Sequence, residues 1–201
     1  MQDANLTSVP AEPGVCLSKS ESEYDVKIPH REAIGSLLFA ARISRPDIEF
    51  AVNCASQFLN CYNQTHWLAV KKIMLYLNGT LNYGIIYGNS GSTLDIKGYT
   101  DADFAGCKDT RRSRSCFVFL LNGGPISWTS RRQNVVAVST VESEYIALFH
   151  GVKEAVWLRR MPNELNVNCD LIPVLVDNQA AINISDNSDD HKGSKHIDVA
   201  S

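Results

Sequence analysis

The segment at residues 92–106 constrains the fold more than any other part of this 201-residue chain. Leu94 and Ile96 alternate with polar residues, which is the period-two pattern of a β-strand. The strand runs into Asp101 and Asp103. Carboxylates at a strand end offer the hard oxygen ligands that Mg²⁺ takes in proteins. The alternative interpretation is a surface turn, because Asp is common where strands stop.

The overall charge gives no general attraction to nucleic acid, because the net charge is −3 and the pI is near 5.9. Polyanion binding would have to come from local basic clusters. The six cysteines are scattered without a CxxC pair, which favours reduced thiols over a zinc site or a disulfide framework. The N-terminus does not resemble a signal peptide, and no apolar run is long enough to span a membrane. We therefore expect an intracellular protein that is not secreted.

The front of the chain is expected to be helical. Residues 1–28 carry Pro, Gly, Ser and Glu and are predicted to be a disordered leader. Apolar residues at helical spacing then predict three helices, over 31–41, from Pro46 to Leu59 and from about Thr65 to Gly79, with Thr65 as an N-cap. A short strand is expected at 83–87. This part shows no catalytic constellation of its own.

The middle of the chain is expected to form an antiparallel meander. A polar loop at 107–115 precedes an apolar strand at 116–121. The AsnGlyGly sequence at 122–124 is a hairpin signal, and Ile126 and Trp128 alternate with polar residues in the returning strand.

A long helix should follow, from a capping box of Ser139 and Glu142 to about Arg160. Glu144 shares one helical face with the small residues Ala147 and Gly151, which indicates that this face lies close to a sheet. Glu144 is therefore expected to point toward the sheet, whereas Glu142 is explained as the cap partner. Pro162 is expected to end or kink the helix.

The apolar run at 172–176 predicts a strand that is buried on both faces. Asp177 follows it, just before another helix that starts at 178–182. An acidic residue in this place is frequent in the active sites of open α/β sheets. A helix N-cap is the equally acceptable alternative for Asp177.

Nine short segments give the chain a resemblance to a known family. The segments YTDADFAG (99–106), GGPISW (123–128), ESEYIAL (142–148), VKEAVWL (152–158), DNQAAI (177–182) and KHID (195–198) resemble the ribonuclease H end of Pol polyproteins from copia-type long-terminal-repeat retrotransposons. The segments REAIGSLLF (31–39), SRPDI (44–48) and WLAVKKIMLYLNGT (67–80) resemble the last part of that family's reverse transcriptase. The resemblance covers about residues 29–198.

The resemblance implies an α/β fold of the ribonuclease H type, with a mixed five-stranded sheet flanked by helices at 92–201. It implies a thumb- or connection-like reverse transcriptase segment at 29–88. The chain resembles a C-terminally truncated fragment that lacks the polymerase palm, so we expect no polymerase activity. In the family, such a protein would be cytoplasmic, in a virus-like particle, or nuclear.

The resemblance further implies hydrolysis of the RNA strand of RNA–DNA hybrids with two Mg²⁺ ions, for which Mn²⁺ can substitute. The implied metal ligands and catalytic acids are Asp101, Glu144, Asp177 and Asp198. His191 could carry a proton, although a solvent-exposed loop histidine is the simpler interpretation.

Basic residues could supply contacts to phosphates: Arg111, Arg112, Arg114, Arg131, Arg132 and Lys195. A solvated basic loop is the alternative. The implied partners are the hybrid and the upstream reverse transcriptase domains of a parent polyprotein.

A catalytically inactive remnant that keeps the fold and binds only nucleic acid or a partner remains the second hypothesis. It is motivated by Val141 where the family has Thr, by Pro162 in a stretch that is usually continuous helix, and by the end of the chain close to Asp198.

Overall fold

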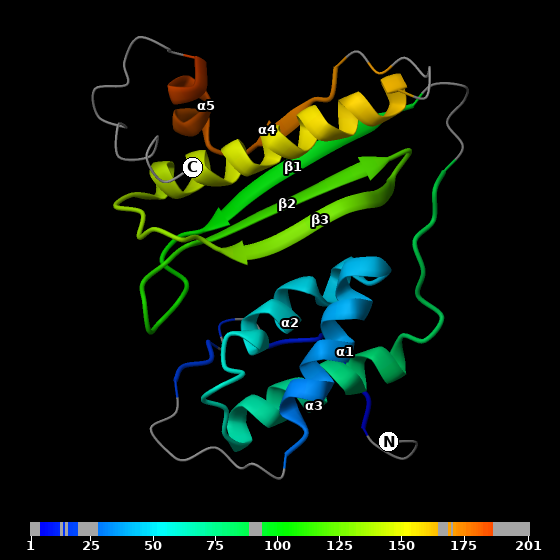
Figure 1. Ribbon diagram of the computed structural model, residues 1–201, viewed down its shortest axis with the longest axis vertical. Coiled ribbons are helices and arrows are strands. Elements are labelled where there is room, and N and C mark those ends of the chain that lie inside the picture. Colours follow the sequence, from blue (N-terminus) through cyan, green and yellow to red (C-terminus); the bar gives the residue numbers. More distant parts are fainter. Residues whose placement is uncertain are drawn as a thin grey trace. The chain divides into compact units, whose positions relative to one another are not determined.

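The computed structural model describes residues 5–12, 14, 16–19, 28–88, 94–164, 169 and 171–186. The chain forms two compact units, Met1–Ile85 and Ile86–Ser201 (Figure 1). The described part of the first unit is helical, and that of the second is a mixed sheet with helices, so the protein is of the α/β class. Among the described helices, none combines the length and the apolar character needed to cross a membrane.

The helical unit contains the helices that the sequence predicted, with corrected boundaries. Its elements are α1 (His30–Ile43), the 3-10 turn η1 (Pro46–Ile48), α2 (Glu49–Ser56) and α3 (Gln64–Gly79). The N-cap of α3 is Asn63 and not Thr65, because the Asn63 side chain accepts hydrogen bonds from the backbone N–H groups of Thr65 and His66. The His66 ring accepts from the Asn63 N–H in return, and this pair forms the capping box.

The core of the helical unit is built from the apolar faces of its helices. Ile34, Val52 and Ile73 are almost fully buried there. Ala11 and Leu17 also pack against this core. Part of the predicted disordered leader therefore contacts folded structure, and the prediction of disorder is corrected for these residues.

An ion pair stabilises the break between α1 and α2. The Arg45 guanidinium lies 2.7 Å from the Asp47 carboxylate. It also donates to the hydroxyl and the carbonyl of Thr80, the C-cap of α3. The Tyr76 hydroxyl donates to Asp47. The SRPDI segment thus ties the turn after α1 to the end of α3.

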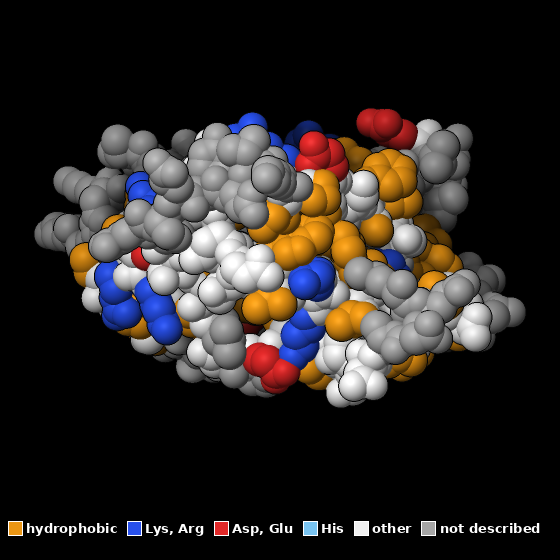
Figure 2. All heavy atoms as spheres, turned by 90° about the horizontal axis from the view of Figure 1, so that it is seen from below, with side chains coloured by type: hydrophobic (Ala, Val, Ile, Leu, Met, Phe, Trp, Pro, Cys, Tyr) orange, Lys and Arg blue, Asp and Glu red, His pale blue; other side chains and the backbone are white. Residues whose placement is uncertain are grey.

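Several large apolar side chains of the helical unit are exposed, among them Phe39, Ile43, Leu68 and Leu81. Figure 2, seen from below relative to Figure 1, shows hydrophobic side chains among charged ones on that face. More than half of the surface of ordinary folded proteins is apolar, so these side chains do not by themselves indicate a binding site.

The second unit contains a mixed sheet in the order β3-β2-β1-β4. Its strands are β1 (Ile96–Asp103), β2 (Arg114–Leu121), β3 (Gly124–Arg132) and β4 (Val174–Val176). β1, β2 and β3 pair antiparallel, and β4 pairs parallel with β1. The hairpin prediction is confirmed: Asn122 and Gly123 both have positive φ, 49° and 86°, as a two-residue turn between twisted strands requires.

Four strands are present among the described residues, and the five predicted strands are not confirmed. The segment at 83–87 forms no strand. Two isolated hydrogen bonds link this region to the hairpin, from the Gly88 N–H to the Asn122 carbonyl and from the Tyr87 hydroxyl to the Pro125 carbonyl. Isolated bonds of this kind do not make a ladder.

The prediction that the 172–176 segment is buried on both faces is wrong. β4 spans only Val174–Val176, and Leu175 is 48% exposed. The reason is its position, because β4 is the edge strand of the described sheet. The apolar run reflects burial of one face together with an exposed Leu175.

α4 (Thr140–Glu164) packs along the sheet, and α5 (Gln179–Asp186) follows β4 (Figure 1). Pro162 lies in the last turn of α4, and the helix ends two residues later. Gly151 allows the close approach that the small residues predicted, because a Cβ at this position would overlap the Thr100 Cγ2 atom.

We predict that Gly151→Ala destabilises the protein by about 1–3 kcal/mol, since the added methyl group overpacks the contact between α4 and β1. Gly35 of α1 is the matched control, because a Cβ there meets nothing within 4 Å. Gly35→Ala should be neutral or stabilising by up to ~1 kcal/mol. Urea unfolding measures both changes. A Gly151→Ala variant as stable as the parent would contradict the close approach, and adding Thr100→Ser should restore part of the loss.

Candidate metal centre

Three carboxylates from distant parts of the chain meet in the second unit. One carboxylate oxygen each from Asp101, Glu144 and Asp177 lies within 4.8 Å of the others. The side chains come from β1, from the first turns of α4 and from the residue directly after β4. The structure thus brings together three of the four acids that the resemblance implied. Asp198, His191 and Lys195 lie outside the described residues.

The parallel pairing of β1 and β4 explains why the two aspartates are close. Thr100 is opposite Val176 in this pairing. Asp101 directly follows Thr100, and Asp177 directly follows Val176. Neighbouring strands lie only about 4.8 Å apart. Both side chains are exposed.

Asp177 is not the N-cap of α5. The Asn178 side chain accepts a hydrogen bond from the Ala181 N–H at 3.0 Å, and the Asn178 carbonyl accepts from Ile182. The neighbouring asparagine therefore does the capping. This removes the alternative interpretation of Asp177 and leaves its carboxylate in the cluster.

The start of α4 separates the roles of its two glutamates. The Ser139 hydroxyl accepts a hydrogen bond from the Glu142 N–H at 3.1 Å, and the Glu142 carboxylate accepts from the Val138 N–H at 2.7 Å. Glu142 is therefore part of the cap, as predicted, although its partner is the residue before Ser139. Glu144 is two residues further along and belongs to the cluster.

Glu144 is the unusual member of the cluster because it is only 8% exposed. Its Oε2 atom has no hydrogen-bond partner among the described residues. Burial and then the nearby charge of Asp101 raise the pKa of Glu144 to about 7, with a smaller contribution from Asp177. A hydrogen bond from the Ala102 N–H acts in the opposite direction. The Gly98 N–H donates to the Pro173 carbonyl on the β4 side of β1, and every second N–H of a strand points to the same side. The Ala102 N–H therefore points to this side as well, beyond the residues that pair with β4.

This arrangement suits a divalent cation. Oxygen atoms on opposite sides of a bound Mg²⁺ are roughly 4.2 Å apart, since each Mg–O distance is about 2.1 Å. The separations in the cluster, at most 4.8 Å, are close to that geometry. A buried carboxylate oxygen without a partner is costly, and a cation would satisfy it. Exposed acidic pairs are common, and it is the buried Glu144 that makes these residues fit a metal.

Asp103 is not part of the cluster. Its carboxylate lies against Gly106, where a Cβ would overlap the Oδ2 atom. The turn between them contains Ala105 at a φ of 52°, and the Ser113 hydroxyl accepts a hydrogen bond from the Ala105 N–H. Asp103 therefore belongs to the turn that follows β1.

The basic residues predicted to contact phosphates are not equivalent. Arg131 and Arg132 are exposed at the end of β3, and Arg111 is exposed in the loop before β2, with Arg112 partly exposed. Arg114 is different, because it is buried and donates to the Ser130 carbonyl at 3.2 Å. We therefore remove Arg114 from the candidate contacts. Arg132 pairs with the residue opposite Asp103, which places it at the end of the sheet that carries Asp101.

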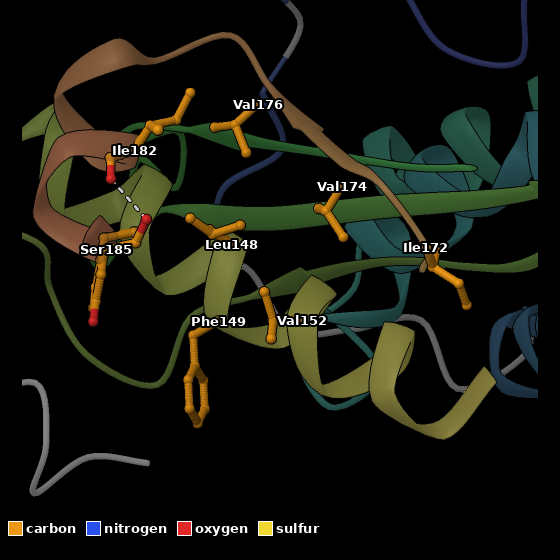
Figure 3. A pocket seen from close by; sticks show the side chains of 9 residues that line it. Leu148, Phe149, Val152, Ile172, Val174, Val176, Ile182 and Ser185 are labelled. Carbon is orange, nitrogen blue, oxygen red and sulfur yellow. Dashed lines mark hydrogen bonds between the residues drawn. The ribbon is translucent and has the colours of Figure 1, made fainter. Parts of the chain in front are cut away.

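A separate apolar pocket of about 470 Å³ lies between α4, β4 and α5. Figure 3 shows Leu148 and Val152 of α4 and Val174 and Val176 of β4 around it. None of the three carboxylates lines this pocket. It adjoins the cluster through Leu148, one helical turn after Glu144, without being part of it.

The second unit thus has an α/β fold, and its three-carboxylate centre suits a divalent cation. Comparison with known proteins places the chain more narrowly. It is 42% identical over 206 residues to the retrovirus-related Pol polyprotein from transposon TNT 1-94 of Nicotiana tabacum, which covers 99% of this chain and 15% of that protein. It is 37% identical over 171 residues to the retrovirus-related Pol polyprotein from transposon RE1 of Arabidopsis thaliana, covering 85% of this chain and 12% of that protein.

The chain belongs to the family of retrovirus-related Pol polyproteins from copia-like transposons. It spans less than a sixth of the two Pol polyproteins named above. It is also 43% identical over 131 residues to secreted RxLR effector protein 161 of Plasmopara viticola, covering 65% of this chain and 92% of that protein. No protein-family model matches the chain, and no solved structure matches it significantly.

We predict that Glu144 makes the stability of the metal-free protein depend on pH. The raised pKa means that the fold favours the neutral carboxyl group, so the stabilising contribution is complete below pH ~4.5 and is lost as the pH rises to about 7. The loss should be at most ~3 kcal/mol. Glu144→Gln should remove this dependence and be more stable at pH 7. Urea unfolding in a chelator at several pH values measures the effect, and parallel curves for the two proteins would contradict it.

We also predict that the protein binds Mn²⁺ and that Asp101→Asn weakens this binding at least ~10-fold, because a charged ligand is replaced by a neutral one. Asp103→Asn is the matched control and should change the affinity by less than about twofold. Titration calorimetry at pH 7.5 measures both. Equal affinities of the two variants would show that the ion does not lie at the carboxylate cluster.

Proposed function

We propose that residues 86–201 form a ribonuclease H-like unit that hydrolyses the RNA strand of RNA–DNA hybrids with the help of divalent cations. The observation that carries the proposal is the meeting of Asp101, Glu144 and Asp177 within 4.8 Å. The order of the elements supports it, since three antiparallel strands are followed by a helix and by a strand parallel to the first. The membership of the chain in the family of retrovirus-related Pol polyproteins also supports the proposal.

The three acids would hold the cations in different ways. Asp101 and Asp177 are exposed and can face a phosphate, whereas buried Glu144 would anchor a cation from the protein side. Bound Mg²⁺ or Mn²⁺ would supply activation of water and stabilisation of the leaving oxygen. The protein's own residues would fix the position of the scissile phosphate relative to this centre. Asp198 as a fourth ligand and His191 as a proton carrier remain predictions.

Recognition of the hybrid would rest on backbone contacts. Arg131 and Arg132 are exposed at the end of the sheet near the acids, and Arg111 and Arg112 lie in the neighbouring loop. Contacts of this kind hold phosphates without reading bases. The ribose 2′-hydroxyl groups would distinguish the RNA strand. Lys195 remains a predicted contact outside the described residues.

The helical unit would correspond to the last part of a reverse transcriptase, with upstream domains of a parent polyprotein as its partners. An intracellular location, in the cytoplasm or the nucleus, belongs to the same proposal.

We predict cleavage of a labelled RNA–DNA hybrid in Mg²⁺ or Mn²⁺, and no cleavage of double-stranded DNA. Asp101→Asn should lower the rate at least ~100-fold, since even residues that only orient metal ligands change activity by 10–100-fold. Asp103→Asn should keep most of the activity. Gel analysis of the labelled RNA strand measures the rates. Intact hybrid after long incubation of folded protein with Mn²⁺ would refute the proposal, and salt-dependent hybrid binding without turnover would support the inactive remnant instead.

A further inference from the structure

A buried glutamine connects the strand ends of the sheet to the start of α4. Gln133 follows β3 directly and is 4% exposed. Its Nε2 atom donates to the Ser115 hydroxyl and to the Ser143 carbonyl, both at 2.9 Å. Its backbone N–H donates to the Ser113 carbonyl at 2.8 Å. A single residue thus bonds to the beginning of β2 and to the first turn of α4.

One partner of Gln133 lies in α4, which carries Glu144, and the other two lie in or next to β2, the strand that pairs with the Asp101 strand β1. Ser143 is fully buried and immediately precedes Glu144. Ser115 lies opposite Ala102, the residue after Asp101, in the pairing of β1 and β2. Ser113 is also fully buried, and its hydroxyl accepts a hydrogen bond from Ala105 in the turn after β1. The polar network therefore links the start of α4, which carries Glu144, to β2, the direct neighbour of the strand that carries Asp101.

We propose that Gln133 is a positioning residue that sets the place of Glu144 relative to Asp101. This inference rests on the proposed metal centre. Both N–H groups of one planar amide are used, so the distance from Ser115 to the Ser143 carbonyl is fixed by the covalent geometry of a single group. An apolar side chain could fill the same space but could not set that distance.

The network is not needed merely to attach α4 to the sheet. Gly151, Ala155 and Leu158 already pack along the sheet side of the helix. A second polar link, from the Ser127 hydroxyl to the Glu154 carboxylate at 2.6 Å, lies about three helical turns from Glu144. The Gln133 Oε1 atom, moreover, has no hydrogen-bond partner among the described residues. A buried acceptor left without a partner is costly, which fits a residue kept for its two donors.

The test compares Gln133→Met, which has similar length and no donor, with Ser127→Ala, which breaks the distant link. Both variants should lose some stability. Gln133→Met should weaken Mn²⁺ binding by about tenfold, as loss of a group that orients a metal ligand does. Ser127→Ala should change the affinity by less than about twofold. Equal effects of the two variants, or an unchanged affinity of folded Gln133→Met, would overturn the proposal.

A readout without metal separates this inference from the proposed function. The Ala102 N–H donates to the Glu144 carboxylate, so in protein kept free of metal by a chelator Glu144→Gln should shift the amide NMR signal of Ala102. Gln133→Met should shift the same signal in the same direction, and Ser127→Ala should leave it in place. If the parent protein binds no Mn²⁺, the metal centre is refuted, and this signal alone decides the role of Gln133. An Ala102 signal unmoved by Gln133→Met would refute that role.

Ser115→Ala covers the case in which Gln133→Met does not fold. It removes one of the two acceptors of the Gln133 amide and leaves the Ser143 carbonyl in place. An intermediate loss of Mn²⁺ affinity, between about twofold and tenfold, is expected. An affinity equal to that of the parent protein would overturn the proposal.

Discussion

Repulsion among three carboxylates is the constraint on which the arrangement of the second unit depends. Asp101, Glu144 and Asp177 lie within 4.8 Å, and Glu144 is buried with one oxygen lacking a partner among the described residues. Such a group is unfavourable as an anion in a metal-free protein. The surrounding packing must therefore hold Glu144 in place. The raised pKa of Glu144 shows that burial and the neighbouring charges disfavour its ionised form. A cation would convert the repulsion into coordination.

Two features of the backbone make the cluster geometrically possible. The parallel pairing of β1 and β4 ends with Thr100 opposite Val176 and so places the next residues, Asp101 and Asp177, side by side. Gly151 then lets α4 approach β1 closely enough for Glu144 to reach the same point. Gln133 links α4 to the sheet, because it bonds to Ser143 on the helix and to Ser115 on β2, the strand next to β1. The site is thus a product of sheet register and helix approach, and no single segment contains it.

The sequence predicted features that depend on neighbouring residues better than features that depend on position in the sheet. The AsnGlyGly hairpin and the division of labour between Glu142 and Glu144 follow from turn chemistry and helical periodicity, and the structure agrees with both. The burial of 172–176 on both faces was wrong, because a pattern of apolar residues does not reveal that β4 is an edge strand among the described residues. Arg114 was grouped with the exposed arginines since charge alone does not show that a strand buries it.

By itself, the sequence determined the family, the helices and most of the strands, and which acids could take part in a site, since these follow from residue type, spacing and short motifs. Only the tertiary structure decided that Asn178 rather than Asp177 caps α5, that the Ala102 N–H faces Glu144, and that Gln133 joins sheet and helix. The physical reason is that backbone donors and uncharged amides carry no periodic signal. Their partners are chosen by strand register and helix packing, which bring together residues far apart in the chain.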